Sequence, residues 1–279
     1  MVLKLVSTIP LSLAALLAGV ASPAHAGMES DWSAPSGTAV RLLAGASDGT
    51  TLAGGIEIRL APGWKTYWRY PGDSGIPPRF DWSGSENVGS VALSWPAPQR
   101  FGDGDGNFSI GYKHDVILPV RIAPKDAAQP VKLRLDLEFA VCEKICQPAH
   151  AALALDVPAA GAAPSPDTLI AAEAALPRRA ALGASGAVGI DTVKLESKAV
   201  RIEARVASAE KGVDLFVEGP TDGWALPLPT LKHVKDGRAE FLMPVDGVPK
   251  GASIAGVPLR FTLIDGNRAV EVEAPLSAP

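Results

Sequence analysis

The chain has 279 residues, and its 26 basic and 30 acidic side chains give a formal net charge of −4. This mild acidity, without a basic patch, argues against nucleic acid as a partner. The 28 glycines, 25 prolines and short apolar runs favour β structure. About 250 residues beyond the N-terminal segment exceed what one small core needs, so we expect two domains.

Residues 1–26 have the pattern of a secretory signal peptide. Lys4 supplies the positive charge, Ile9 to Val20 form a short apolar core, and Ala24 to Ala26 form a small-x-small cleavage site. The apolar run is shorter than the roughly 20 residues of a membrane anchor. We therefore predict export and cleavage near Gly27, and we expect no later segment to span the membrane.

A first domain is predicted over residues 27–157, with repeated strand signals from about Ala39 to Val157. Two segments alternate strictly between apolar and polar residues, Ile56–Leu60 and Val131–Phe139. Further strands are predicted at Trp64–Arg69, Arg79–Trp82, Val91–Trp95, Val116–Ile122 and Ala151–Val157. Turn residues, including the glycine-rich segment from Gly102 to Asn107, separate them. Short alternating strands with frequent turns predict an antiparallel sandwich.

Residues 158–187 have the composition of a linker, with a short helix predicted at Asp167–Leu176 and ended by Pro177. A second β-sandwich domain is predicted over residues 188–279. Its expected strands are Lys194–Val206, Val213–Glu218, Ala239–Met243, Pro258–Ile264 and Ala269–Ala274. This half shows no catalytic cluster, so we expect it to support or space the first half. The fold class predicted is all-β, with two tandem sandwiches.

The two cysteines, Cys142 and Cys146, are the candidate reactive residues. A disulfide needs Cα atoms roughly 4.4–6.8 Å apart, whereas four residues of extended strand span about 13 Å. The backbone must therefore turn within Glu143–Ile145 if the sulfur atoms are to meet. The ring so closed is small, and the chain-entropy model gives it only about 2 kcal/mol of stabilisation. Such a bridge is better placed for chemistry than for holding a fold together.

The neighbours of the pair can tune it. Alternation places Cys142 opposite the apolar row of Leu133–Phe139, so we expect it to point toward a surface or loop. Lys144 lowers a thiol pKa and Glu143 raises it, so the net direction stays open. His150 is a candidate proton acceptor.

Three interpretations of the pair remain open on spacing alone. The cysteines can form a structural disulfide, a redox-active dithiol, or a copper or zinc site in which Cys142, Cys146 and His150 are the ligands. A second cluster, the aromatic residues Trp64, Tyr67, Trp68 and Trp82, can form a ligand platform, but core packing is the commoner role and the one we expect.

Several motifs together resemble one known family, the N-terminal periplasmic domain of the DsbD/ScsB thiol:disulfide interchange proteins. The short cysteine spacing is closer to the ScsB-type branch. The resemblance covers roughly residues 35–157. It rests on Gly63–Trp82, Trp95-Pro96-Ala97-Pro98, Gly111-Tyr112, Leu118-Pro119-Val120 and Cys142-x3-Cys146-x-Pro148.

The resemblance implies an immunoglobulin-like sandwich that relays electrons by thiol–disulfide exchange, a protein-disulfide reductase activity that needs no cofactor. Cys142 and Cys146 would be the exchanging pair. An aromatic ring of the segment Phe101 to Phe108 would shield it, either Phe101 or Phe108. The partners implied are a polytopic membrane thiol reductase and thioredoxin-like proteins of the periplasm.

The chain ends at Pro279 without membrane spans, so we expect that reductase to be a separate protein. Two alternatives from other functional classes accompany this interpretation. One is a periplasmic copper-binding protein of copper tolerance that uses the same cysteines, and the other is a non-catalytic interaction scaffold.

Overall fold

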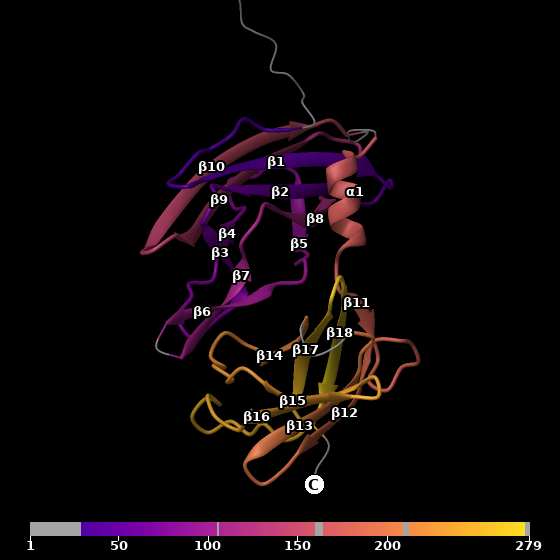
Figure 1. The fold of residues 1–279 in the computed structure, drawn as a ribbon. Coiled ribbons are helices and arrows are strands. Elements are labelled where there is room, and N and C mark those ends of the chain that lie inside the picture. Colours follow the sequence, from indigo (N-terminus) through magenta and orange to yellow (C-terminus); the bar gives the residue numbers. More distant parts are fainter. Residues whose placement is uncertain (1–28, 105, 160–163, 209–211, 277–279) are drawn as a thin grey trace, which may run out of the picture.

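A computed structural model describes residues 29–104, 106–159, 164–208 and 212–276. The predicted signal peptide lies outside these residues. The strands form two β-sandwiches, one above the other in Figure 1, with a short helix beside the first. The predicted all-β class, two tandem immunoglobulin-like sandwiches joined through a short helical linker, is confirmed.

The first sandwich consists of two sheets. One has the strand order β1-β2-β8-β5, and the other has the order β10-β9-β3-β7-β6, with β4 also paired to β9. The strands of the first sheet are β1 (Thr38–Ser47), β2 (Leu52–Leu60), β8 (Val116–Pro124) and β5 (Val88–Leu93). Those of the second are β10 (Cys146–Val157), β9 (Val131–Cys142), β3 (Lys65–Gly72), β7 (Asn107–Tyr112), β6 (Gln99–Gly104) and β4 (Arg79–Asp81).

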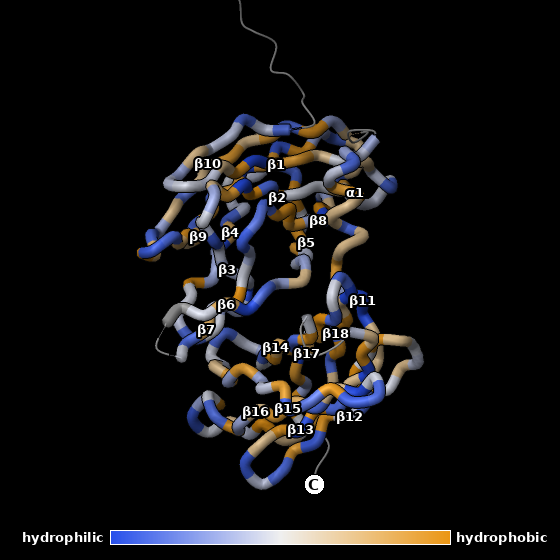
Figure 2. Tube along the Cα trace, in the orientation of Figure 1, coloured by the Kyte–Doolittle hydropathy of each residue, from blue (hydrophilic) through white to orange (hydrophobic). Residues whose placement is uncertain are grey.

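The core of the first sandwich follows from the alternation seen in the sequence. Leu133, Leu135 and Leu137 on β9 are buried, and the polar residues between them face outward. β10 alternates in the same way and pairs with β9 over the whole length of both strands. Figure 2 shows apolar residues gathered within the strands of both sandwiches.

The helix α1 (Asp167–Ala174) packs against the first sandwich, beside β8 in Figure 1. Its buried Leu169 packs closely against Gly45 and Gly55, where a Cβ atom at either glycine would lie about 3 Å from the leucine side chain. Arg121 of β8 forms an ion pair with Glu173 of the helix. The predicted helix is confirmed, although it ends earlier than expected. In the described part of the chain, no helix combines the length and apolar character that a membrane span requires.

The second sandwich has two four-stranded sheets, ordered β11-β18-β17-β14 and β12-β13-β16-β15. The first contains β11 (Arg178–Ala180), β18 (Arg268–Pro275), β17 (Pro258–Asp265) and β14 (Val213–Glu218). The second contains β12 (Gly189–Leu195), β13 (Ala199–Arg205), β16 (Arg238–Pro244) and β15 (Thr230–Lys235). The strand predicted at Lys194–Val206 is wrong, because a turn after Leu195 divides it into two paired strands. Part of the predicted linker is strand β11, which runs parallel to β18.

The two sandwiches share an apolar contact. Trp68 of β3 is fully buried, and its ring lies 5.8 Å from that of Phe216 of β14, measured between centroids. Phe216 packs with the core of the first sandwich although it belongs to the second. The first core is therefore completed by a ring from the other half of the chain.

Charged groups surround this contact. Arg69 binds Glu218 through Nε at 2.8 Å and Glu271 through Nη2 at 2.6 Å, and these three side chains are each less than a fifth exposed. Arg100 of β6 forms two hydrogen bonds with the carboxylate of Asp214 of β14. β3 and β6 are thereby both fixed to the second sandwich.

Candidate functional site

The two cysteines face each other across the end of the β9–β10 hairpin. Cys142 is the last residue of β9, Cys146 is the first of β10, and the two are directly paired. Paired residues of antiparallel strands have Cα atoms about 4.5–5.5 Å apart, which is within the range of a disulfide. Both cysteines are free, and their sulfur atoms lie 2.7 Å apart. The predicted turn at Glu143–Ile145 is confirmed, and the pair can form a disulfide without a change of register.

The two thiols differ in exposure. Cys146 is exposed, whereas Cys142 is buried in a small cluster with Tyr67 and Ala140. The expectation that Cys142 points to a surface or loop is therefore wrong. Its predicted position on the face of β9 opposite the apolar row is right. Lys65 of β3 pairs with Cys142, so Tyr67, two residues further, lies on the same face of the sheet and covers it.

Tyr67 also contacts the exposed sulfur. Its hydroxyl lies 2.9 Å from Sγ of Cys146. Burial, with the hydrogen bond to Cys146 and the nearby Cys142, raises the pKa of Tyr67 well above its usual value. The hydroxyl therefore stays protonated where thiols ionise, and it can donate a hydrogen bond to a thiolate at Cys146.

Burial also raises the pKa of Cys142, and its contact with Cys146 adds to this effect. The positive charge of Lys65 opposes the shift without reversing it. Cys142 is consequently held as a neutral thiol at neutral pH. The site thus combines an accessible sulfur with a covered, protonated one.

The two phenylalanines expected to shield the pair lie on the β6–β7 hairpin. Phe101 is buried, and its ring centroid is 4.5 Å from Nζ of Lys65 and 5.1 Å from Nζ of Lys113. Phe108 is partly exposed and lies beside Arg100, near the start of β7. The residue of β7 that pairs with β3 next to the site is Tyr112, at the other end of that strand. The ring of Tyr67 contacts both cysteines, and shielding by Phe101 or Phe108 stays a prediction.

The remaining candidates lie on the exposed side of the hairpin. Lys144 is exposed in the connecting loop. His150 forms a contact of 2.9 Å with Asp136 through Nε2, on the exposed face of β9 and β10. Four residues of strand separate His150 from Cys146, a distance of about 13 Å.

The metal alternative is not supported by this geometry. Among the described residues, no three His, Cys, Asp or Glu side chains come together as metal ligands. The set of Cys142, Cys146 and His150 is therefore not assembled.

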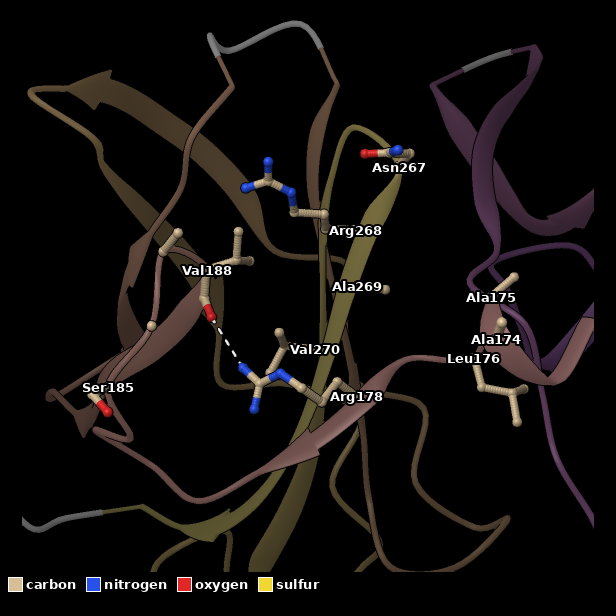
Figure 3. A pocket seen from close by; sticks show the side chains of 12 residues that line it. Ala174, Ala175, Leu176, Arg178, Ser185, Val188, Asn267, Arg268, Ala269 and Val270 are labelled. Carbon is tan, nitrogen blue, oxygen red and sulfur yellow. Dashed lines mark hydrogen bonds between the residues drawn. The ribbon is translucent and has the colours of Figure 1, made fainter. Parts of the chain in front are cut away.

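A separate hollow of about 500 Å³ lies between the end of α1 and the second sandwich. Figure 3 shows the side chains of Arg178 and Arg268 at this hollow, with Arg178 bonded to the carbonyl of Val188 at 3.4 Å. No cysteine is among the residues that line it.

The fold and the site define a class of protein, a tandem β-sandwich that carries an accessible dithiol at a hairpin end. Residues 34–158 match the family model "Thiol:disulfide interchange protein DsbD, N-terminal". This is the segment in which the sequence motifs indicated a resemblance to that family. Residues 175–279 match the model of a domain of unknown function, DUF8393.

A solved structure extends the likeness to both sandwiches. The crystal structure of the N-terminal periplasmic domain of ScsB from Proteus mirabilis has a TM-score of 0.69 and 22% sequence identity, covering 90% of this chain and 98% of that one. This likeness shows a shared fold. A conserved domain protein from Bacillus anthracis aligns with a TM-score of 0.20 and 10% identity over 84% of this chain and 77% of its own, too weak to support an argument. No curated protein matches the chain.

Tyr67 and Lys65 are the site residues that the sequence analysis missed. Both lie in the Gly63–Trp82 stretch, whose aromatic residues were expected to be core. The sequence does place them on one face of a strand. What it lacks is the pairing of β3 with the end of β9, which brings that face over Cys142.

Proposed function

We propose that this protein is a thiol–disulfide exchange module whose reactive pair is Cys142 and Cys146. The observation that carries the proposal is their direct pairing at a hairpin end, with one sulfur exposed and the other covered. The match of residues 34–158 to the DsbD N-terminal family supports it.

In the reduced protein, the thiolate of Cys146 attacks a disulfide of the partner, because Cys146 is the sulfur that a partner can reach. The partner's S–S bond breaks, a mixed disulfide forms, and the departing partner sulfur takes up a proton. Tyr67 donates its hydroxyl hydrogen to the attacking sulfur and stabilises its negative charge before the attack.

Cys142 completes the reaction. It loses its proton and attacks Sγ of Cys146, forming the Cys142–Cys146 disulfide and releasing the partner's second sulfur as a thiol. Two electrons and two protons have then moved from the pair to the partner. Both sulfur atoms belong to one chain, so this second step is intramolecular. Their short distance favours it over attack by an outside thiol.

By similarity to the family, we place this reaction in the periplasm. A separate membrane thiol reductase would reduce the Cys142–Cys146 disulfide, and thioredoxin-like periplasmic proteins would receive the electrons. The predicted signal peptide at residues 1–26 agrees with this location.

Trapping the intermediate tests the proposal. The Cys142→Ser variant should accumulate a mixed disulfide with a small disulfide such as hydroxyethyl disulfide, because no second thiol resolves it. Under the same conditions, the Cys146→Ser variant should react far more slowly, since its remaining thiol is covered. Mass spectrometry of the intact protein measures both adducts.

Equilibration of the unmodified protein with a redox buffer series then gives the midpoint potential. A value below about −300 mV, with no adduct in the Cys142→Ser variant, would show an inert structural disulfide and overturn the proposal.

A further inference from the structure

A surface hollow of about 440 Å³ adjoins the dithiol site. Pro148, two residues after Cys146, is part of its wall. The other lining residues include Ile76, Pro77, Arg79, Glu138 and His150.

The sheet places this hollow on the same face as the exposed sulfur. Alternation along β10 puts Cys146, Pro148 and His150 on the outer face. Glu138 of β9 pairs with His150 on one side and with Arg79 of β4 on the other, which forms the floor. The segment with Ile76 and Pro77, just before β4, forms the opposite wall.

The spacing matches that of a bound chain. A mixed disulfide holds the partner's cysteine with its Cα about 4.4–6.8 Å from that of Cys146. In an extended segment, the side chain two residues from that cysteine lies about 6.6 Å further and points to the same side. On this protein, Pro148 likewise lies two residues from Cys146 along β10 and on the same face of the strand. The partner's second neighbour therefore falls at the hollow.

The chemistry of the wall indicates what kind of side chain fits. Ile76 is 49% exposed, and Pro77 and Pro148 are also exposed, so an apolar group entering the hollow would cover them. Among the polar lining residues, His150 is already bound to Asp136. A carboxylate in the hollow would meet Glu138 as well as Arg79, and it would leave the apolar wall uncovered.

We propose that this hollow is a specificity subsite. Its occupant is an apolar side chain, two residues from the reactive cysteine, on an extended segment of the partner protein. This inference rests on the proposed exchange function and adds a sequence preference that thiol chemistry by itself does not impose.

Two peptides test the preference. In each, one cysteine forms a mixed disulfide with 2-mercaptoethanol, and both second neighbours of that cysteine are either leucine or serine, with serine at the adjacent positions. Reduction of each peptide by the reduced protein is followed by chromatography. Covering part of the apolar wall should make the leucine peptide react about tenfold faster.

Two variants link that preference to the hollow. In Ile76→Asp, the ratio of the two rates should fall to about one. In Ile170→Asp, a matched change of an exposed isoleucine on α1, the ratio should stay near that of the unmodified protein. Circular dichroism checks that both variants are folded.

Each outcome decides between the two proposals. Equal rates for the two peptides, or a preference that survives Ile76→Asp, overturn the subsite while leaving the exchange function in place. If the unmodified protein fails to reduce even hydroxyethyl disulfide, the exchange function falls and the subsite falls with it.

Discussion

The accessible start and the covered middle of strand β3 serve two different purposes. At its start, Lys65 and Tyr67 lie beside the cysteines, near a hairpin end that projects from the edge of the first sandwich (Figure 1). Directly after them, in the middle of the strand, Trp68 and Arg69 are buried against the second sandwich. Reactive groups thus occupy the accessible end, and the residues that join the two halves of the chain occupy the covered middle.

This comparison indicates how oxidation of the cysteine pair affects the stability of the fold. A disulfide between Cys142 and Cys146 closes a loop of only three intervening residues, so it removes little freedom from the unfolded chain. The interface instead joins residues 149 and 202 positions apart, Arg69 with Glu218 and Glu271. We therefore expect oxidation and reduction to leave the fold intact, and substitutions at the interface to destabilise it.

The largest effect is expected from Trp68→Ala in the covered middle of β3. Loss of a fully buried tryptophan leaves a cavity between the sandwiches and should lower the free energy of unfolding by about 3–5 kcal/mol. Urea denaturation measures it. Trp32→Ala is the control, because Trp32 is partly exposed and its loss should cost under about 1 kcal/mol. Equal losses in the two variants would contradict the role given to the interface.

Arg69→Met should destabilise the protein by about 3 kcal/mol, because Glu218 would keep a buried charge without its partner and Glu271 would keep only its longer contacts, of 3.9 Å, with arginines of the second sandwich. The matched control is Arg134→Met, which removes an exposed ion pair with Asp156 and should cost at most about 1 kcal/mol. Adding Glu218→Gln to Arg69→Met should recover part of the loss. The prediction fails if the two arginine variants unfold at the same urea concentration.

At the accessible end, Tyr67→Phe should slow alkylation of Cys146 by iodoacetamide about tenfold at neutral pH, since a hydrogen bond to a thiolate is lost. The measurement is made in the Cys142→Ser background, where one thiol remains. Tyr112→Phe is the control, because its hydroxyl binds the carbonyl of Pro96 instead. An unchanged rate in Tyr67→Phe would show that the contact with Cys146 does not stabilise the thiolate.

The smallest effect concerns pH. Because burial raises the pKa of Cys142, the unfolded chain releases this proton first as pH rises. The contribution of Cys142 to stability is therefore complete below the ordinary cysteine pKa of about 8.5, and it is lost as pH rises through the higher folded value. Urea denaturation of the reduced protein from pH 7 to 10, compared with Cys142→Ser, should show a steeper decline in the unmodified protein. Parallel curves would contradict it.

Local pattern was enough to predict much of the fold. The alternation of Val131–Phe139 identified β9, the cysteine spacing required the hairpin turn, and Val213–Glu218 was predicted with its observed bounds as β14. Glycine-rich residues hid β6 and β7, because a strand that contains glycine lacks the apolar period on which the prediction depends. Both sides of the β12–β13 turn carry strand-forming residues, so the two strands were merged into one.

The site was predictable only in part, for a related reason. The cysteines are near neighbours in the chain, and their pairing follows from a local turn. The position of Tyr67 depends on contacts with residues 79 positions away, which no periodicity encodes. The packing of Phe216 into the first core was not predicted for the same reason, because Phe216 lies beyond the boundary expected between the two halves of the chain.

The ion pair of Arg69 with Glu271 has a consequence for the order of assembly. During synthesis, most of the second half must emerge before Glu271 of β18 can reach β3. The first sandwich can collapse earlier, but Trp68 and Arg69 stay uncovered until the second sandwich has folded and docked. We expect refolding to end with this docking as its slowest step, so that protease sensitivity near β3 outlasts the recovery of β structure.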